Sequence, residues 1–371
     1  GLRSLGEQAF YGCRSLKEIS FPDSLVSLGD MAFYRCSGLG TLCLPPALDH
    51  VGNLAFAQSG VRRVRIQGTG CGYGNGLFFG CLSLGTVILE SGVRHIPDRL
   101  AYGCKALKQV VLPDTLESVG RSVWEDTPFL EEHPLSGDIF WDGRNLSGDV
   151  RLPEETRIVA GGAFYGNLAL TSVRFPDSVT WIGPAALKGC CRLGQVTWPR
   201  TVTRAQEEVF SGCTSLETVT GSGTSAPVPW RHIGQRAFFG CLCLEHVALS
   251  QVQVVEKEGF SGCTRLVPDH PDALVRVGEQ AFAGTGACGD RSSREPVVLG
   301  SILVSIVVAL MLASHISSPM KACAERMKRL VEGDLESPVP NITSKDETGV
   351  LAASTAELVQ GLSTIINDIG Y

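Results

Sequence analysis

Apolar and polar residues follow one another along this chain in a unit of about 23 residues that recurs twelve times. Each unit begins with an aliphatic residue and Gly, continues with Ala-Phe and Gly-Cys, and ends in alternating apolar residues that Pro often closes. The Phe position, called the anchor below, recurs mostly at spacings of 22 or 23 residues. The twelve anchors are Phe10, Phe33, Phe56, Phe78, Ala101, Trp124, Phe164, Leu187, Phe210, Phe238, Phe260 and Phe282.

The end of each unit predicts a short strand. Leu107, for example, is followed by Val110 and Leu112 at alternate positions and then by Pro113. Period-two alternation that ends at Pro is typical of a strand. A unit this short cannot bury its own apolar face, so the copies must stack as successive rungs of a solenoid, which we place at residues 1–286.

Two spacings between anchors are longer than the rest. There are 40 residues between Trp124 and Phe164, and 28 between Phe210 and Phe238. These spacings predict insertions near residues 131–149 and 220–232 in an otherwise regular stack.

The repeat resembles the BspA-like leucine-rich repeat over residues 2–286. The resemblance implies a curved solenoid with strands on one face, in a family used mostly for surface recognition and adhesion. The insertion from Thr127 to Asp149 is similar to a longer unit that recurs in this family, which implies a structural role for its Trp141.

Eight of the fourteen cysteines lie three residues after an anchor, where the other rungs carry Ser59, Thr127, Asn167 and Thr285. All four replacements hydrogen-bond readily to backbone, so we interpret the column as an internal ladder of buried thiols. Disulfides are the alternative, although parallel side chains of adjacent rungs point the wrong way for them. The ladder residues are Cys13, Cys36, Cys81, Cys104, Cys190, Cys213, Cys241 and Cys263.

The second insertion offers one candidate recognition site. Its Gly-, Ser- and Pro-rich sequence leads to Trp230 and Arg231, and an exposed aromatic residue beside a cation is a plausible ligand anchor. The alternative is that Trp230 caps the stack, because the next repeat begins at Ile233.

Residues 297–316 contain no Asp, Glu, Lys or Arg and are long enough to cross a bilayer as one helix. Four basic residues follow closely, at Lys321, Arg326, Lys328 and Arg329. Only two lie shortly before the span, so the bias favours a cytoplasmic C-terminal side. We therefore predict a linker at 287–296, a single-pass transmembrane helix in the cell membrane, and extracellular repeats.

Beyond the span, apolar residues at spacings of three and four predict two coiled-coil helices, one starting at Met320 and one at Leu351. With Pro319, Gly333-Asp334-Leu335 and Asp346-Glu347-x-Gly349, residues 317–369 resemble a HAMP domain. The resemblance implies a parallel homodimeric coiled coil that relays signals, with Val339 and Ile342 inserting between its helices. The flanking sequence to Tyr371 is similar to that of methyl-accepting chemotaxis receptors, so we assign residues 370–371 to the start of an output region.

Composition and missing motifs argue against several classes of function. The net charge is −6, and Lys and Arg form no basic stripe, which argues against a nucleic-acid partner. We find no nucleophile elbow, no phosphate-binding loop and no second Cys pair at zinc spacing, so we expect no catalytic residue, metal or cofactor. The predicted fold is α+β in several parts: a strand-rich leucine-rich-repeat solenoid, one transmembrane helix and a HAMP coiled coil.

These parts together predict a fragment of a single-pass membrane receptor. The repeats would bind an extracellular protein, peptide or glycan, and the HAMP domain would relay the signal within a homodimer to an output domain of chemotaxis type. We read Gly1 as a cut end inside the first repeat. Two alternatives stay open: a membrane-anchored adhesin with a passive dimeric foot, and a fusion of unrelated genes.

Overall fold

The computed structural model describes residues 1–67, 72–223, 227–268 and 273–286. The chain divides into two compact units, residues 1–290 and 291–371, and every described residue belongs to the first. The predicted linker, span and HAMP domain lie outside the described ranges. Among the described residues, no helix is both long enough and apolar enough to cross a membrane.

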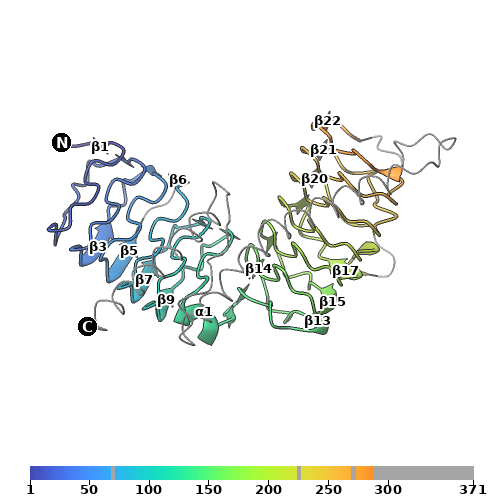
Figure 1. Cartoon of the computed structure of the whole chain (residues 1–371), viewed down its shortest axis with the longest axis horizontal. Helices are drawn as coiled ribbons and strands as arrows, with labels where there is room; N and C mark the ends of the chain where they lie inside the picture. The colour runs from blue at the N-terminus through green and yellow to red at the C-terminus, as the bar shows by residue number, and fades with distance from the viewer. Residues whose placement is uncertain (68–71, 224–226, 269–272, 287–371) are drawn as a thin grey trace, which may run out of the picture. The chain divides into compact units, whose positions relative to one another are not determined.

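The predicted strands form parallel ladders along the repeats (Figure 1). In β3 (Thr41–Leu44), Leu42 and Leu44 are buried while Thr41 and Cys43 are exposed, which is the period-two pattern of the sequence. One sheet joins β3 to β5 (Arg63–Ile66), β7 (Thr86–Leu89) and β9 (Gln109–Val111). Another joins β13 (Gly148–Arg151), β15 (Leu170–Arg174), β17 (Gln195–Trp198) and β19 (Thr218–Gly221).

A second ladder of two-residue strands runs beside the first, so strands are not confined to one face as the resemblance implied. The residues before the repeat's first Gly pair between rungs, as Leu28 does with Val51. The early strands are β1 (Ser4–Leu5), β2 (Ser27–Leu28), β4 (His50–Val51), β6 (Gly72–Tyr73), β8 (His95–Ile96) and β10 (Ser118–Val119). The later ones are β14 (Ile158–Val159), β16 (Trp181–Ile182), β18 (Arg204–Ala205), β20 (His232–Ile233), β21 (Val254–Val255) and β22 (Arg276–Val277).

The anchors form a column of stacked rings inside the solenoid. The ring centroids of Phe33 and Phe56 lie 5.2 Å apart, and those of Phe238 and Phe260 lie 5.0 Å apart, with nearly parallel planes. These separations are close to the strand spacing of ~4.8 Å, so one ring fits each rung. The anchor column therefore explains why the sequence repeats an aromatic residue at a fixed interval.

The first insertion folds into a helix and a hairpin. Helix α1 (Pro128–Glu132) starts at Thr127, whose hydroxyl accepts a hydrogen bond from the Leu130 N–H and caps the helix. Strands β11 (Leu135–Ser136) and β12 (Ile139–Phe140) then pair antiparallel. Strand β12 joins β14 and so continues the ladder of two-residue strands.

The buried side chains form two apolar clusters that meet at this insertion. The first cluster includes Trp124 and Trp141, and the second includes Phe140 and Phe164. The Phe140 ring stacks on Phe164 at 5.1 Å, whereas the Trp141 indole meets Trp124 edge-on at 5.9 Å. Phe140 and Trp141, which are adjacent in the sequence, thus pack in different clusters. Trp141 has the buried structural position that the resemblance implied.

Candidate functional site

The predicted thiol ladder is present as a regular series of hydrogen bonds. Seven of the eight thiols donate to the carbonyl oxygen of the anchor one rung earlier, as Cys104 does to Phe78 at 3.1 Å. Cys13 is exposed because it belongs to the first rung. The other six pairs are Cys36 with Phe10, Cys81 with Phe56, Cys190 with Phe164, Cys213 with Leu187, Cys241 with Phe210 and Cys263 with Phe238. All eleven described cysteines are free thiols.

The rungs without Cys use the replacement residue for similar bonds. Asn167 donates to the carbonyls of Gly143 and Leu146 at 2.9 and 2.8 Å, so it ties the first insertion to its rung. Thr127 donates to the carbonyl of Trp124 at 2.5 Å while it caps α1. This column fastens adjacent segments together.

The proposed recognition role of Trp230 is wrong. Its side chain is 0% exposed and packs between Trp198 and Phe238, with ring centroids 5.4 and 5.2 Å away. The anchor rings of Phe210 and Phe238 stay stacked at 4.9 Å, and the Trp230 indole packs against both of them in the second apolar cluster. Arg231 is exposed, but no exposed aromatic ring lies beside it in the sequence.

The predicted relay residues lie outside the described part of the chain. They are Pro319, Gly333, Asp334, Leu335, Val339, Ile342, Asp346, Glu347 and Gly349.

A hollow of about 680 Å³ lies beside the first insertion, and we call it the insertion hollow. Its lining comes from the turns around six anchors, from Phe79 in one rung to Glu208 five rungs later, and from Trp141, Asp142 and Arg144 of the insertion. A second hollow of about 550 Å³ adjoins it and shares Tyr102, Asp142 and Arg144 among its lining residues. Both volumes are in the range of pockets that hold small molecules.

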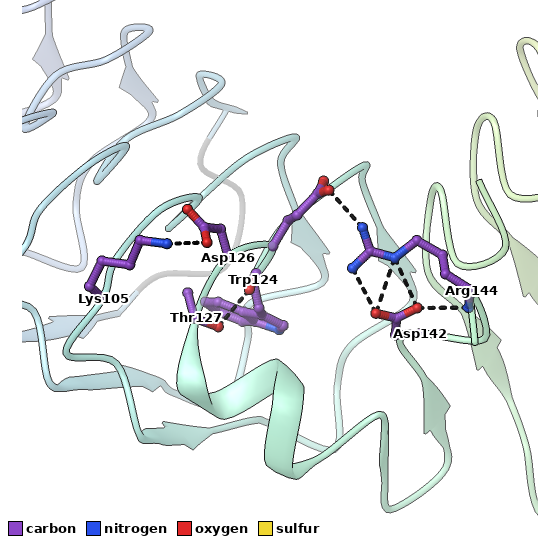
Figure 2. A network of polar contacts seen from close by, with 7 residues as sticks. Lys105, Trp124, Asp126, Thr127, Asp142 and Arg144 are labelled. Carbon is purple, nitrogen blue, oxygen red and sulfur yellow. Dashed lines mark hydrogen bonds and ion pairs between the residues drawn. The ribbon is translucent and has the colours of Figure 1, made fainter. Parts of the chain in front are cut away.

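Two groups of ion pairs cross the insertion hollow. Arg144 contacts Asp142 and Glu125, each at 2.7 Å, and Figure 2 shows Arg144 facing Asp142 near the start of α1. The hydrogen bonds that Arg144 donates to Asp142 raise the pKa of Arg144; burial opposes this shift, and the charges of Asp142 and Glu125 add to it. Arg121 contacts Asp98 at 2.9 Å and Glu208 at 3.4 Å, and Lys188 contacts Glu208 at 2.7 Å.

The pairs of Arg121 connect distant parts of the sequence. Arg121 and Glu208 are 87 residues apart in the sequence, yet their side chains meet in the wall of the hollow. Burial disfavours the charge of Arg121, but Asp98 outweighs it, and the pKa of Arg121 is raised. The hollow therefore has charged walls in which each contact just described is between opposite charges.

Two buried indole groups line the same hollow. Trp124 is 1% exposed and Trp141 is 5% exposed. Within the described residues, neither indole N–H has a hydrogen-bond acceptor. A buried N–H without a partner carries a free-energy penalty, so such groups in a cavity wall are candidates to donate to a ligand.

Aromatic rings from rungs before and after the insertion line the hollow. Phe79 and Tyr102 come from consecutive rungs, and their rings stack at 5.2 Å. Tyr165, at the same repeat position beyond the insertion, is 54% exposed. The sequence pattern did not identify this site, because its residues are ordinary turn positions until the insertion brings distant rungs together. An aromatic residue after an anchor, next to an insertion, is the signal that could have suggested it.

Several solved structures of leucine-rich repeat proteins are similar to this chain at low identity. One is a leucine-rich repeat protein from Bacteroides ovatus, with 24% identity, coverage of 76% of this chain and 74% of that one, and a TM-score of 0.34. Another is a leucine rich cell surface protein from Faecalibacterium prausnitzii, with 21% identity, coverage of 78% and 84%, and a TM-score of 0.35. No curated protein matches the chain.

Two family profiles match different parts of the sequence. The HAMP domain profile matches residues 311–354. The profile of the BspA type leucine rich repeat region matches residues 2–132 and 135–267 in six copies, which together exceed half of the 371 residues. The chain belongs to the BspA type leucine rich repeat family.

Proposed function

We propose that this chain is the recognition and relay part of a single-pass membrane receptor. The observation that carries the proposal is the order of its parts: BspA type repeats, a stretch of twenty residues without Asp, Glu, Lys or Arg, and a HAMP match within one chain. In this proposal the repeats face outward and bind a ligand, residues 297–316 cross the membrane, and the HAMP domain relays the signal to an output region of chemotaxis type.

The repeats support the recognition half of the proposal. The insertion hollow combines aromatic, charged and unpartnered donor groups in a concave surface, which is the usual composition of a binding site. Elsewhere the thiol ladder and the anchor column serve the fold itself.

The relay half rests on the HAMP match and on its sequence motifs. Val339 and Ile342 lie in the connector between the two predicted helices, where they would pack inside a parallel homodimer. A bundle of this kind with two packing states would convert a shift of the membrane helix into a change at its far end.

The relay can be tested in a fusion of the chain, after Tyr371, to the kinase-control hairpin of a chemotaxis receptor. In a dimer of the Ser292→Cys variant, a disulfide between the two introduced thiols would displace the two chains relative to each other by a fixed amount near the membrane. We expect that cross-linking changes kinase activity in the fusion. Val339→Ser with Ile342→Ser should abolish this change, whereas Asn341→Ser, in the same connector, should keep it.

Two results would overturn the relay. One is a change in kinase activity that survives the Val339 and Ile342 substitutions. The other is an unmodified fusion that forms the cross-link but shows no change in kinase activity, which would favour a membrane-anchored adhesin with a passive foot.

A further inference from the structure

We infer that the insertion hollow binds an uncharged saccharide. This inference rests on the proposed recognition role of the repeats and names the chemistry of the ligand. Three independent properties of the hollow support it: the unpartnered donors, the aromatic rings and the balance of charge.

Two buried donors beside the hollow lack a partner. The side chains of Trp124 and Trp141 line the hollow, and no described residue accepts a hydrogen bond from their indole N–H groups. Both side chains are at least nine-tenths buried, so a ligand oxygen that reached them would relieve the penalty of two unsatisfied donors. A hydroxyl or ring oxygen can do this without carrying a charge.

The aromatic rings suit the C–H faces of a sugar ring. Phe79 and Tyr102 form a stacked pair on one side of the insertion, and Tyr165 stands exposed on the other. Aromatic faces pack well against such weakly polar C–H groups, while the phenol hydroxyls of the two tyrosines remain able to hydrogen-bond. Rings from rungs before and after the insertion would offer a pyranose more than one packing surface.

The charges of the hollow favour a neutral ligand. Its lining holds the acidic residues Asp98, Glu125, Asp142 and Glu208 and the basic residues Arg99, Arg121, Arg144 and Lys188, so the formal charges cancel. Arg121, Arg144 and Lys188 already contact carboxylates, and a charged ligand would have to displace one of these pairs. Hydroxyl groups can instead hydrogen-bond to the carboxylate and guanidinium groups while the ion pairs persist.

A peptide fits this site less well. Extended peptides bind by adding a strand to a free sheet edge. The hollow is lined by turns whose backbone groups already bond between rungs, as the Phe78 N–H does to the Leu100 carbonyl at 2.8 Å. The adjoining second hollow, with its shared Tyr102 and Asp142, gives room for more than one sugar unit.

The test is a titration of the full chain in lipid nanodiscs with uncharged tetrasaccharides of glucose, mannose, xylose and N-acetylglucosamine. Calorimetry measures binding, and tetragalacturonate and a Gly-Ser tetrapeptide serve as charged and peptide comparators. We expect at least one uncharged sugar to bind with a Kd below about 1 mM. Tyr165→Ala should weaken that binding about tenfold, which corresponds to ~1.4 kcal/mol.

Matched controls separate the hollow from the rest of the solenoid. Tyr11 is an exposed tyrosine at the same repeat position in the first rung, so Tyr11→Ala should leave the Kd unchanged. Trp141→Phe should weaken binding, whereas Trp230→Phe, which removes another unpartnered buried indole N–H away from the hollow, should not.

The inference is overturned if no uncharged tetrasaccharide binds at about 10 mM, if only a comparator binds, or if Tyr165→Ala binds as tightly as the unmodified chain. The chain with Val339→Ser and Ile342→Ser should bind the sugar normally. A failure of the saccharide proposal can therefore be distinguished from a failure of the relay proposal.

Discussion

At the residue scale, the thiol ladder depends on thiols that stay neutral. Burial raises the pKa of Cys81 from 9.0 to about 11, and burial likewise raises the pKa of Cys104 and Cys213. A neutral thiol can donate the ladder hydrogen bond, whereas a thiolate cannot. The same burial makes these thiols poor nucleophiles, because the thiolate is the reactive form.

The first prediction concerns the pH dependence of this bond. Cys81→Ala should lower the free energy of unfolding by about 1–3 kcal/mol at neutral pH, because the Phe56 carbonyl loses its donor. The folded pKa of Cys81 exceeds the unfolded value of 9.0, so the unfolded chain releases this proton first as pH rises. The stability that Cys81 contributes is therefore complete below pH 9 and is lost between pH 9 and about 11.

Urea unfolding of both proteins at a series of pH values measures this effect. The advantage of the unmodified chain over Cys81→Ala should shrink above pH 9, whereas the exposed Cys43, replaced by Ala, should cause little change at any pH. A constant difference between the two proteins across this range would show that the Cys81 thiol is not held neutral.

At the element scale, adjacent rungs approach each other closely at the first Gly of the repeat. A Cβ added at Gly52 would overlap the backbone N of Asp30 in the preceding rung. The equivalent Gly6 belongs to the first rung, and a Cβ there would meet nothing within 4 Å. Stacking therefore explains the repeated Gly. An added Cβ should be harmful only where a preceding rung lies against that Gly.

The second prediction follows from this contrast. Gly52→Ala should destabilise the chain by about 1–3 kcal/mol, because the added methyl group forces the rungs apart. Gly6→Ala, at the same repeat position, should be close to neutral. Thermal unfolding measured by circular dichroism compares the two, and equal losses would mean that a local backbone preference for Gly, rather than stacking, decides the effect.

The third prediction concerns helix α1. Thr127→Ala removes both the cap of the helix and the bond to the Trp124 carbonyl, and it should cost about 1–2 kcal/mol. Thr127→Ser keeps the hydroxyl and should recover most of that loss. If both substitutions were equally harmful, the methyl group of Thr127, and not its hydroxyl, would be the important feature.

The parts of the fold that depend on the repeat were predictable, since each anchor and each ladder thiol recurs in the same environment. The burial of Trp230 could not be predicted from the sequence, because Trp198 and Phe238 come next to it only when the rungs stack. The insertion hollow was missed for a similar reason. No periodic signal connects Arg121 with Glu208, which meet only through the insertion between them.

At the scale of the whole described solenoid, the apolar interior is two clusters and not one. Trp141 belongs to the first cluster, and Phe140, its neighbour in sequence, belongs to the second. In repeat proteins each rung contacts only its neighbours, so a weak junction lets the parts unfold at different denaturant concentrations. The insertion is the place where this solenoid should separate.

The fourth prediction tests this junction by thiol labelling in urea. Cys104 lies in the first cluster and Cys241 in the second, and both are fully buried in the folded chain. Trp141→Ala, which removes up to ~3–5 kcal/mol of packing, should lower the urea midpoint for labelling of Cys104 more than that of Cys241. Trp230→Ala, in the second cluster, should do the reverse. Simultaneous labelling of both thiols in all variants would show a single cooperative core.

The free thiols also impose an order of events on the newly made chain. Before folding, the described repeats carry eleven cysteines with no fixed partners, and an oxidising compartment would let thiolates pair them at random. After folding, the seven buried ladder thiols are hydrogen-bonded and shielded at the corners of the rungs. In such a compartment, folding therefore competes kinetically with oxidation. Rungs that fold quickly protect their own cysteines from mispairing.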